Sequence, residues 1–170
     1  NYDLKNKVNN LYQLKNNNYV ANAEASKKVL NSLNKISKTE SSILLSGLTG
    51  SGREFLARKI HFESNRNNKR FKVIDFYDLD RVKTEIKLFG SEEKGIIKSV
   101  GILEDVNGGT LFVKNIDKMS SKVQGKLLRV LEEKKYYRIG GVSSNNIDFR
   151  IISSSKMLLN DLKKCSSFRN

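Results

Sequence analysis

Residues 47 to 54 read GLTGSGRE and follow the apolar run at 43–45 after a single serine. Their spacing is that of a phosphate-binding loop, GxxxxGK[ST], in which glycines let successive backbone N–H groups converge on phosphate oxygens at a helix N-terminus. Apolar residues continue at helical spacing from Phe55 to Ile60. A strand at 43–46, a glycine loop and a helix therefore predict a nucleotide phosphate site, with the candidate residues Gly47, Leu48, Thr49, Gly50, Ser51, Gly52, Arg53 and Glu54.

Two positions of this loop depart from the motif. Arg53 stands in place of the lysine, and Glu54 in place of the hydroxyl residue. Arginine keeps the positive charge, but its guanidinium is broad, planar and set further from the backbone than an ammonium. We therefore expect attraction of phosphate to persist while positioning for transfer suffers. Because Glu54 has no hydroxyl, the position that binds magnesium in the motif offers none.

The rest of the chain alternates between strand and helix patterns. In the helix expected at 121–133, the apolar residues are Val123, Leu127, Leu128 and Leu131. Such alternation favours an α/β fold with a parallel sheet covered by helices. The other expected elements are a helix at 23–37, a strand at 71–76, a helix near 82–88, a strand at 110–113 and a strand at 148–153.

The first 18 residues are polar, with Leu4, Val8, Leu11 and Leu14 three or four positions apart. This spacing predicts a short amphipathic helix or the end of a coiled coil, and a frayed terminal helix explains it equally well. Asn16–Asn18 break the pattern. We place a boundary there, with a linker helix at 1–18 and the main domain at 19–170.

Composition limits the classes of function. The net charge of +14 invites a nucleic-acid-binding hypothesis, but Lys and Asn are spread over the whole chain and no basic stripe interleaved with aromatics occurs. No apolar run is long enough to cross a membrane. A single cysteine, Cys165, favours a reducing cytoplasm. The only histidine, His61, has no partner at metal-ligand spacing and is predicted to pack rather than to catalyse.

From residue 19 onward the chain resembles the AAA+ sigma-54 interaction domain of bacterial enhancer-binding transcription regulators. Matching segments occur in the family's order: GLTGSGRE and ARKIH at 47–61, KLFG at 87–90, NGGTLF at 107–112, QGKLLRVLEEKKYYRIGG at 124–141, DFRII at 148–152 and FR at 168–169. The resemblance implies a P-loop core whose parallel sheet is sandwiched by helices, truncated before the family's lid subdomain. It also implies ATP or ADP as ligand, with the adenine near Val20 and Ala21.

A narrower resemblance is to NtrX-like response regulators. The family's GAFTGA loop, which contacts sigma-54, is absent, and Gly95–Val100 leads straight to Gly101. The NtrX-like pattern implies a two-component system with a sensor histidine kinase, receiver and DNA-binding helix-turn-helix domains elsewhere in the protein, and self-association through the AAA+ core. A cytoplasmic location follows, with no membrane partner.

The resemblance also identifies altered catalytic positions. Lys114 and Asn115 stand where the family has the magnesium-binding Asp and the water-polarising Glu. Lys156 occupies the sensor position, and Arg169 matches an arginine finger. An ammonium opposes Mg²⁺, and an amide cannot take a proton, so hydrolysis is expected to be lost. The segment assigned to the nucleotide site is Val106, Asn107, Gly108, Gly109, Thr110, Leu111, Phe112, Val113, Lys114 and Asn115.

The favoured hypothesis is therefore a nucleotide-binding but non-hydrolysing AAA+ core in transcription regulation. One alternative is a working ATPase that drives oligomerisation-dependent transcription activation. Another is a basic nucleic-acid-binding module, which rests on net charge alone. A gene under relaxed constraint would also explain the altered positions, although the regular apolar pattern of 121–133 shows that the fold is still specified.

Overall fold

A four-stranded parallel sheet forms the centre of the computed structural model, which describes residues 32–33, 35–77 and 81–165. The strand order is β1 (Ile43–Ser46), β8 (Arg150–Ser155), β5 (Thr110–Lys114) and β2 (Phe71–Asp75). Each neighbouring pair runs parallel. The predicted α/β fold with a parallel sheet is confirmed.

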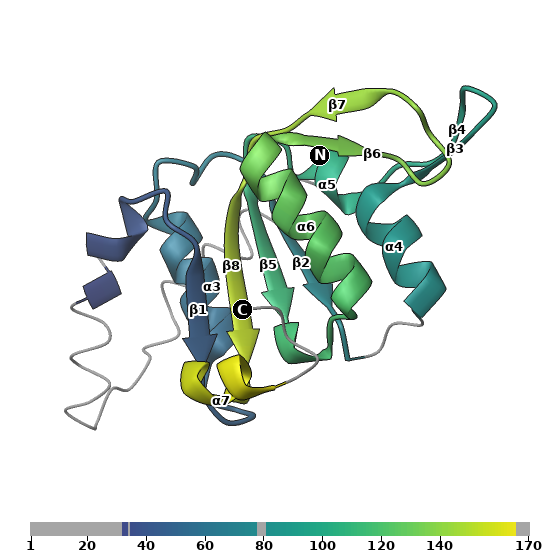
Figure 1. Cartoon of the computed structure of the whole chain (residues 1–170). Coiled ribbons are helices and arrows are strands. Elements are labelled where there is room, and N and C mark those ends of the chain that lie inside the picture. Colours follow the sequence, from purple (N-terminus) through teal and green to yellow (C-terminus); the bar gives the residue numbers. More distant parts are fainter. Residues whose placement is uncertain (1–31, 34, 78–80, 166–170) are drawn as a thin grey trace.

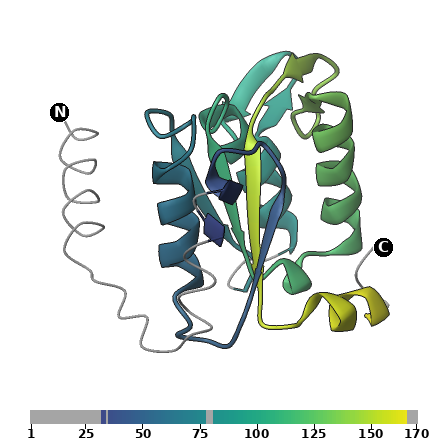
Figure 2. The ribbon, with the colours of Figure 1, turned by 90° about the vertical axis from the view of Figure 1, so that its left-hand side faces the viewer.

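Helices cover both faces of the sheet (Figures 1 and 2). The helix α3 (Arg53–Phe62) lies on one face, and α6 (Ser121–Glu133) lies on the other. Strand β5 is buried on both sides because its side chains alternate: Leu111 and Val113 join the core beneath α6, while Phe112 joins the core beneath α3. The α6 face also carries α4 (Arg81–Phe89) and the short α5 (Ile102–Asp105).

The structure corrects the expected bounds of β8 and the expected core residues of α6. Strand β8 begins at Arg150 rather than 148 and continues to Ser155, because its buried serines pair in register with β1 although they are not apolar. In α6, Leu128 is 47% exposed, so it lies on the solvent face; Val130 occupies the core instead. The bounds of α6 agree with the prediction, since the Ser120 side chain caps its first turn by accepting from the Val123 amide.

Two hairpins at one end of the sheet were not predicted. The first joins β3 (Ser91–Glu93) to β4 (Ile96–Ser99) through Lys94 and Gly95, whose φ angles are +50° and +79°. Two successive positive φ values are typical of a tight two-residue turn. The passage that lacks the family's GAFTGA loop is therefore a short hairpin. The remaining elements are the second hairpin, β6 (Lys135–Tyr137) with β7 (Ser144–Asn146), then η1 (Ile116–Lys118) and α7 (Leu159–Lys164).

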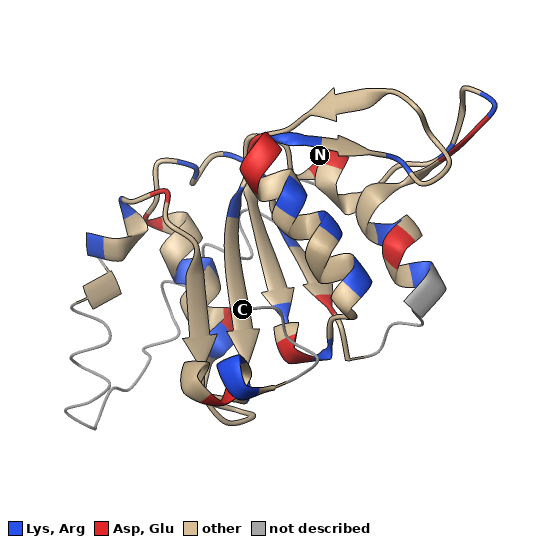
Figure 3. Ribbon diagram, in the orientation of Figure 1, with Lys and Arg blue, Asp and Glu red and all other residues tan. Residues whose placement is uncertain are grey.

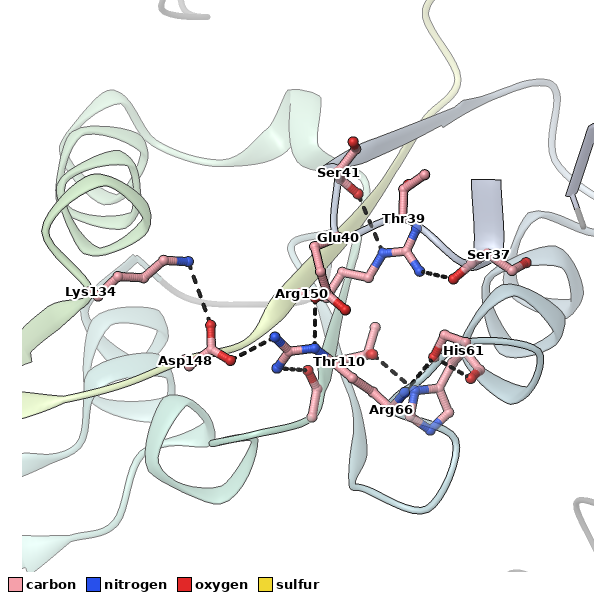
Figure 4. A network of polar contacts seen from close by, with 12 residues as sticks. Ser37, Thr39, Glu40, Ser41, His61, Arg66, Thr110, Lys134, Asp148 and Arg150 are labelled. Atoms are coloured by element: carbon pink, nitrogen blue, oxygen red, sulfur yellow. Dashed lines mark hydrogen bonds and ion pairs between the residues drawn. The ribbon is translucent and has the colours of Figure 1, made fainter. Parts of the chain in front are cut away.

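A polar network joins the amino-terminal ends of the central strands to the segment before β1 (Figure 4). The guanidinium of Arg150, only 1% exposed, donates to the backbone carbonyls of Ile36, Ser37 and Ser41 at 2.7–3.3 Å. His61 is buried on α3, and its Nδ1 lies 2.9 Å from Oγ1 of Thr110. Its surroundings are those of a packing residue, as predicted.

The amino-terminal predictions lie largely outside the described residues. These are the linker helix at 1–18 and most of the helix at 23–37, of which residues 32–33 and 35–37 are seen as helical. Among those seen, Leu33 is buried in the core beneath α3. Within the described ranges, no helix is both long enough and apolar enough to span a membrane.

Candidate functional site

A cleft of about 480 Å³ opens at the carboxyl ends of the four parallel strands. This is the edge at which open α/β sheets bind their ligands, because the loops that leave the strands converge there. The glycine loop lies along it, between β1 and α3. The residues that line the cleft are Thr49, Gly50, Ser51, Gly52, Arg53, Glu54, Phe55, Asp75, Tyr77, Phe112, Lys114, Asn115, Ser154 and Lys156.

The loop keeps the backbone geometry of a phosphate cradle. Gly50 and Gly52 have φ angles of +83° and +77°, which other residues rarely adopt, and Gly52 is the cap residue of α3. The Gly47 amide donates to the carbonyl of Ser155 at 3.2 Å, which ties the loop to the end of β8. First-turn amides of a helix have no intrahelical partner, so the start of α3 presents donors to an anion.

Arg53 carries an unsatisfied donor in this cleft. Its Nη1 is buried and has no hydrogen-bond partner among the described residues. Buried polar groups in folded proteins are nearly always paired, and a guanidinium binds phosphate oxygens with particular strength. A phosphate held by the loop would supply an acceptor of the kind that Arg53 lacks. The residues at the amino-terminal end of α3 therefore fit a nucleotide phosphate.

Lys114 lies between two carboxylates at the mouth of the loop. Its Nζ is 3.2 Å from Oδ2 of Asp75 and 3.4 Å from Oε2 of Glu54. Burial opposes the charge on Lys114, but the two carboxylates outweigh it and raise the pKa of the ammonium. Burial likewise opposes ionisation of Glu54, whose pKa is nevertheless lowered by Arg58 and then by Lys114. All three groups are therefore ionised at neutral pH.

Asp75 was missed in the sequence. It ends β2 in register with Lys114 of β5, and its Oδ1 accepts from Nδ2 of Asn115 at 2.6 Å and from the Tyr77 amide at 3.0 Å. Burial acts to raise the pKa of Asp75, but these two donors and Lys114 outweigh burial, so the pKa is lowered. The sequence does carry one signal for Asp75, which is its position at the end of a predicted strand. Polar residues at the ends of neighbouring parallel strands meet at one edge of the sheet.

The predicted sensor residue also reaches this edge. Lys156 follows β8, lines the cleft and is exposed, with its Nζ 5.6 Å from the centre of the Tyr77 ring. At this distance the ammonium is attracted by the face of the ring. Three other predicted site residues, Val20, Ala21 and Arg169, lie outside the described residues.

The structure does not bring the segment before β5 to the cleft. Asn107, Gly108 and Gly109 form the turn that leads into β5, at the end of the strand opposite Lys114. A Cβ on Gly109 would lie 2.1 Å from the Arg70 carbonyl oxygen, so the glycine is required for backbone packing. Val106 before β5, and Thr110, Leu111 and Val113 within it, are buried and do not line the cleft. Of the predicted segment, the cleft is lined by Phe112, Lys114 and Asn115.

Comparison with known proteins agrees with this arrangement. The family model described as "Sigma-54 interaction domain" matches residues 19–170. The regulatory protein AtoC of Escherichia coli K12 is 32% identical over 176 residues, covering 98% of this chain and 38% of AtoC. The nitrogen assimilation regulatory protein NtrX of Azorhizobium caulinodans is 38% identical over 138 residues, covering 81% of this chain and 30% of that protein.

A solved structure resembles the whole domain. NtrX from Brucella abortus in complex with ADP superposes with a TM-score of 0.85 at 32% identity, covering 99% of this chain and 36% of that chain. The same protein in complex with ATP gives the same TM-score. The chain thus spans less than half of the relatives that it matches. Because the family model covers residues 19–170 and the fold agrees, this chain belongs to the sigma-54 interaction domain family of AAA+ proteins.

Proposed function

We propose that this domain binds ADP or ATP in the loop cleft, does not hydrolyse ATP, and serves as a regulatory AAA+ core in an NtrX-like response regulator. The unsatisfied Nη1 of Arg53 carries the binding part of the proposal, because a phosphate on the adjacent loop satisfies it. Support comes from the related NtrX of Brucella abortus, which was crystallised with both nucleotides.

Loss of hydrolysis rests on the residues at the end of β5. Asn115 stands where the family has its water-polarising Glu, and its amide is held by Asp75. Asp75 is itself engaged by Lys114, Asn115 and the Tyr77 amide, which makes it a weak base. Loss of a general base typically costs a factor of about 10²–10⁴ in rate. The glycine loop, which has Arg53 in place of lysine, and the end of β5, which has Lys114 and Asn115, therefore both lack groups that the family uses to hydrolyse ATP.

The regulatory part of the proposal comes from the NtrX-like resemblance and from the hairpin between β3 and β4. A tight turn at Lys94 and Gly95 replaces the GAFTGA loop, so the domain is proposed not to engage the sigma-54 holoenzyme. The proposed partners are a second copy of the AAA+ core, the receiver and helix-turn-helix domains of the same protein, and a sensor histidine kinase. DNA binding is assigned to the helix-turn-helix domain.

The distribution of charge does not favour a nucleic-acid surface on this domain. Figure 3 shows acidic and basic residues alternating along α4, and basic residues followed by acidic ones at the carboxyl-terminal end of α6. Lys122 and Lys126 of α6 both pair with Glu85 of α4, at 2.8 and 2.7 Å. Their charges are thus partly neutralised within the domain.

Calorimetric titration with ADP tests the proposal. Loss of a charge-assisted hydrogen bond costs about 1.5–3 kcal/mol, so Arg53→Ala is expected to weaken ADP binding by about ten- to a hundredfold. Arg129→Ala is the matched control, since Arg129 is exposed and pairs only with Glu133 among the contacts described. Equal affinity of Arg53→Ala and the unaltered chain would contradict binding in this cleft.

A further inference from the structure

The ammonium of Lys114 occupies the space between two carboxylates that belong to different elements. Asp75 ends β2, Glu54 lies in the first turn of α3, and Lys114 ends β5. The nitrogen is 3.2 Å from one carboxylate and 3.4 Å from the other. The side chain of Lys114 is 34% exposed and lines the cleft.

A divalent ion does not fit this arrangement. Mg²⁺ binds carboxylate oxygens at about 2.0–2.1 Å and keeps an octahedral shell. Here both carboxylates already share one ammonium, and the second oxygen of Asp75 accepts from Asn115 and from the Tyr77 amide. Glu54 also accepts from Arg58 at 2.8 Å. Within the described residues, no group of three or more His, Cys, Asp or Glu side chains is arranged to hold a metal.

We infer that Lys114 takes the place of the divalent cation, so that the cleft receives a nucleotide polyphosphate in its metal-free form. Three basic residues, Arg53, Lys114 and Lys156, line the cleft against two acidic ones, Glu54 and Asp75. Lys114 neutralises the carboxylates that would otherwise repel a polyphosphate, and the cleft stays positive without a metal. This inference rests on the proposed binding of ADP or ATP.

The two roles that Lys114 could have make different predictions. If Lys114 only stabilises the fold, its removal changes the melting temperature and nothing else. If it replaces the metal, its removal leaves two facing carboxylates in the cleft, which is a site that a divalent ion can enter. Lys114→Arg keeps a positive charge beside the two carboxylates and should therefore still exclude a divalent ion.

Two measurements on the whole chain test the inference. Electron paramagnetic resonance of Mn²⁺ alone, without nucleotide, reports metal binding; titration of ADP in EDTA and in Mg²⁺ reports metal dependence. The unaltered chain should bind no Mn²⁺ at low millimolar concentration, and its ADP affinity should be no higher in Mg²⁺ than in EDTA, because Mg²⁺ in solution competes with the protein for free ADP. Lys114→Ala should bind Mn²⁺, lose at least about tenfold in ADP affinity in EDTA, and regain it in Mg²⁺. Lys98→Ala, which removes an exposed lysine of the β3–β4 hairpin, should behave as the unaltered chain does.

Each outcome decides a separate point. Binding of Mn²⁺ by the unaltered chain, or ADP affinity at least tenfold higher in Mg²⁺, overturns the inference. A folded Lys114→Ala variant that gains no Mn²⁺ binding also overturns the inference. If the alanine variant does not fold, Lys114→Gln is measured in its place. If no form binds ADP, the proposed function fails, while the Mn²⁺ measurement still decides whether Lys114 excludes a metal.

Discussion

Asn115 donates a hydrogen bond from Nδ2 to Oδ1 of Asp75 at 2.6 Å. An amide thus lies directly after β5, where the family resemblance places a carboxylate, and the carboxylate of the pair lies at the end of β2. This reversal bears on any attempt to restore catalysis. A glutamate introduced at 115 would face Asp75, and two carboxylates at hydrogen-bond distance cannot both be ionised without a large cost.

Restoring hydrolysis should therefore need four substitutions. We expect Arg53→Lys, Lys114→Asp, Asn115→Glu and Asp75→Asn together to give slow, Mg²⁺-dependent phosphate release. The same variant with Asn115 retained should be about 10²–10⁴ times slower, because it lacks a base. Arg53→Lys alone should release no phosphate. The groups act as one unit, so the single effects should not add. Hydrolysis by Asn115→Glu alone would contradict this account of the site.

The pH dependence of stability should reflect His61. Burial is the main cause that lowers the pKa of His61 to about 4, against a hydrogen bond to the Lys69 backbone that raises it. The unfolded chain, with a histidine pKa near 6.5, then binds a proton that the folded chain excludes between these values. The free energy of unfolding therefore keeps the contribution of neutral, buried His61 in full above pH 6.5, and this contribution is lost as the pH falls toward 4. This loss is about 3 kcal/mol.

Urea unfolding at several pH values measures this effect. His61 is the only histidine of the chain, so His61→Gln should flatten the dependence between pH 6.5 and 5 even if the variant is less stable throughout. Equal slopes for both proteins would show that His61 is not the group responsible.

Arg150 should be important for stability rather than for ligand binding. Its guanidinium donates to three backbone carbonyls that would lose their partner in Arg150→Met. Ser37 is the buried residue of the three, and a buried carbonyl left unsatisfied costs about 1–3 kcal/mol, so a loss of at least about 1–3 kcal/mol in the free energy of unfolding is expected. Arg129→Met, at an exposed ion pair, should cost less than about 1 kcal/mol. Similar losses for the two variants, measured by urea unfolding, would be inconsistent with this role.

The short β3–β4 hairpin predicts no productive contact with sigma-54. In a reconstituted assay with the sigma-54 holoenzyme and a cognate promoter, this domain and ATP should give no open complexes above background. A family member that carries the GAFTGA loop serves as the positive control. Open complexes that depend on this domain and on ATP would disprove the prediction.

The long, periodic elements could be predicted from the sequence, whereas the contacts between them could not. Strand β5 and helix α6 carry strong apolar patterns, and both were predicted within one residue. The hairpins were missed because strands such as Ser91–Glu93 are short and have no alternating pattern. Asp75 was missed because its role depends on the register that sets it beside Lys114. In contrast, the glycine loop needs only local sequence, and its conformation agrees with the motif.

The most direct test of nucleotide binding without hydrolysis is to identify the nucleotide that the protein retains. Excess purified chain is mixed with radiolabelled ATP and Mg²⁺, and the retained nucleotide is separated by rapid filtration and resolved by chromatography. The proposed function predicts that intact ATP is recovered, and that Arg53→Ala retains much less. Recovery of ADP formed from that ATP would contradict the loss of hydrolysis, and retention of no nucleotide would contradict binding.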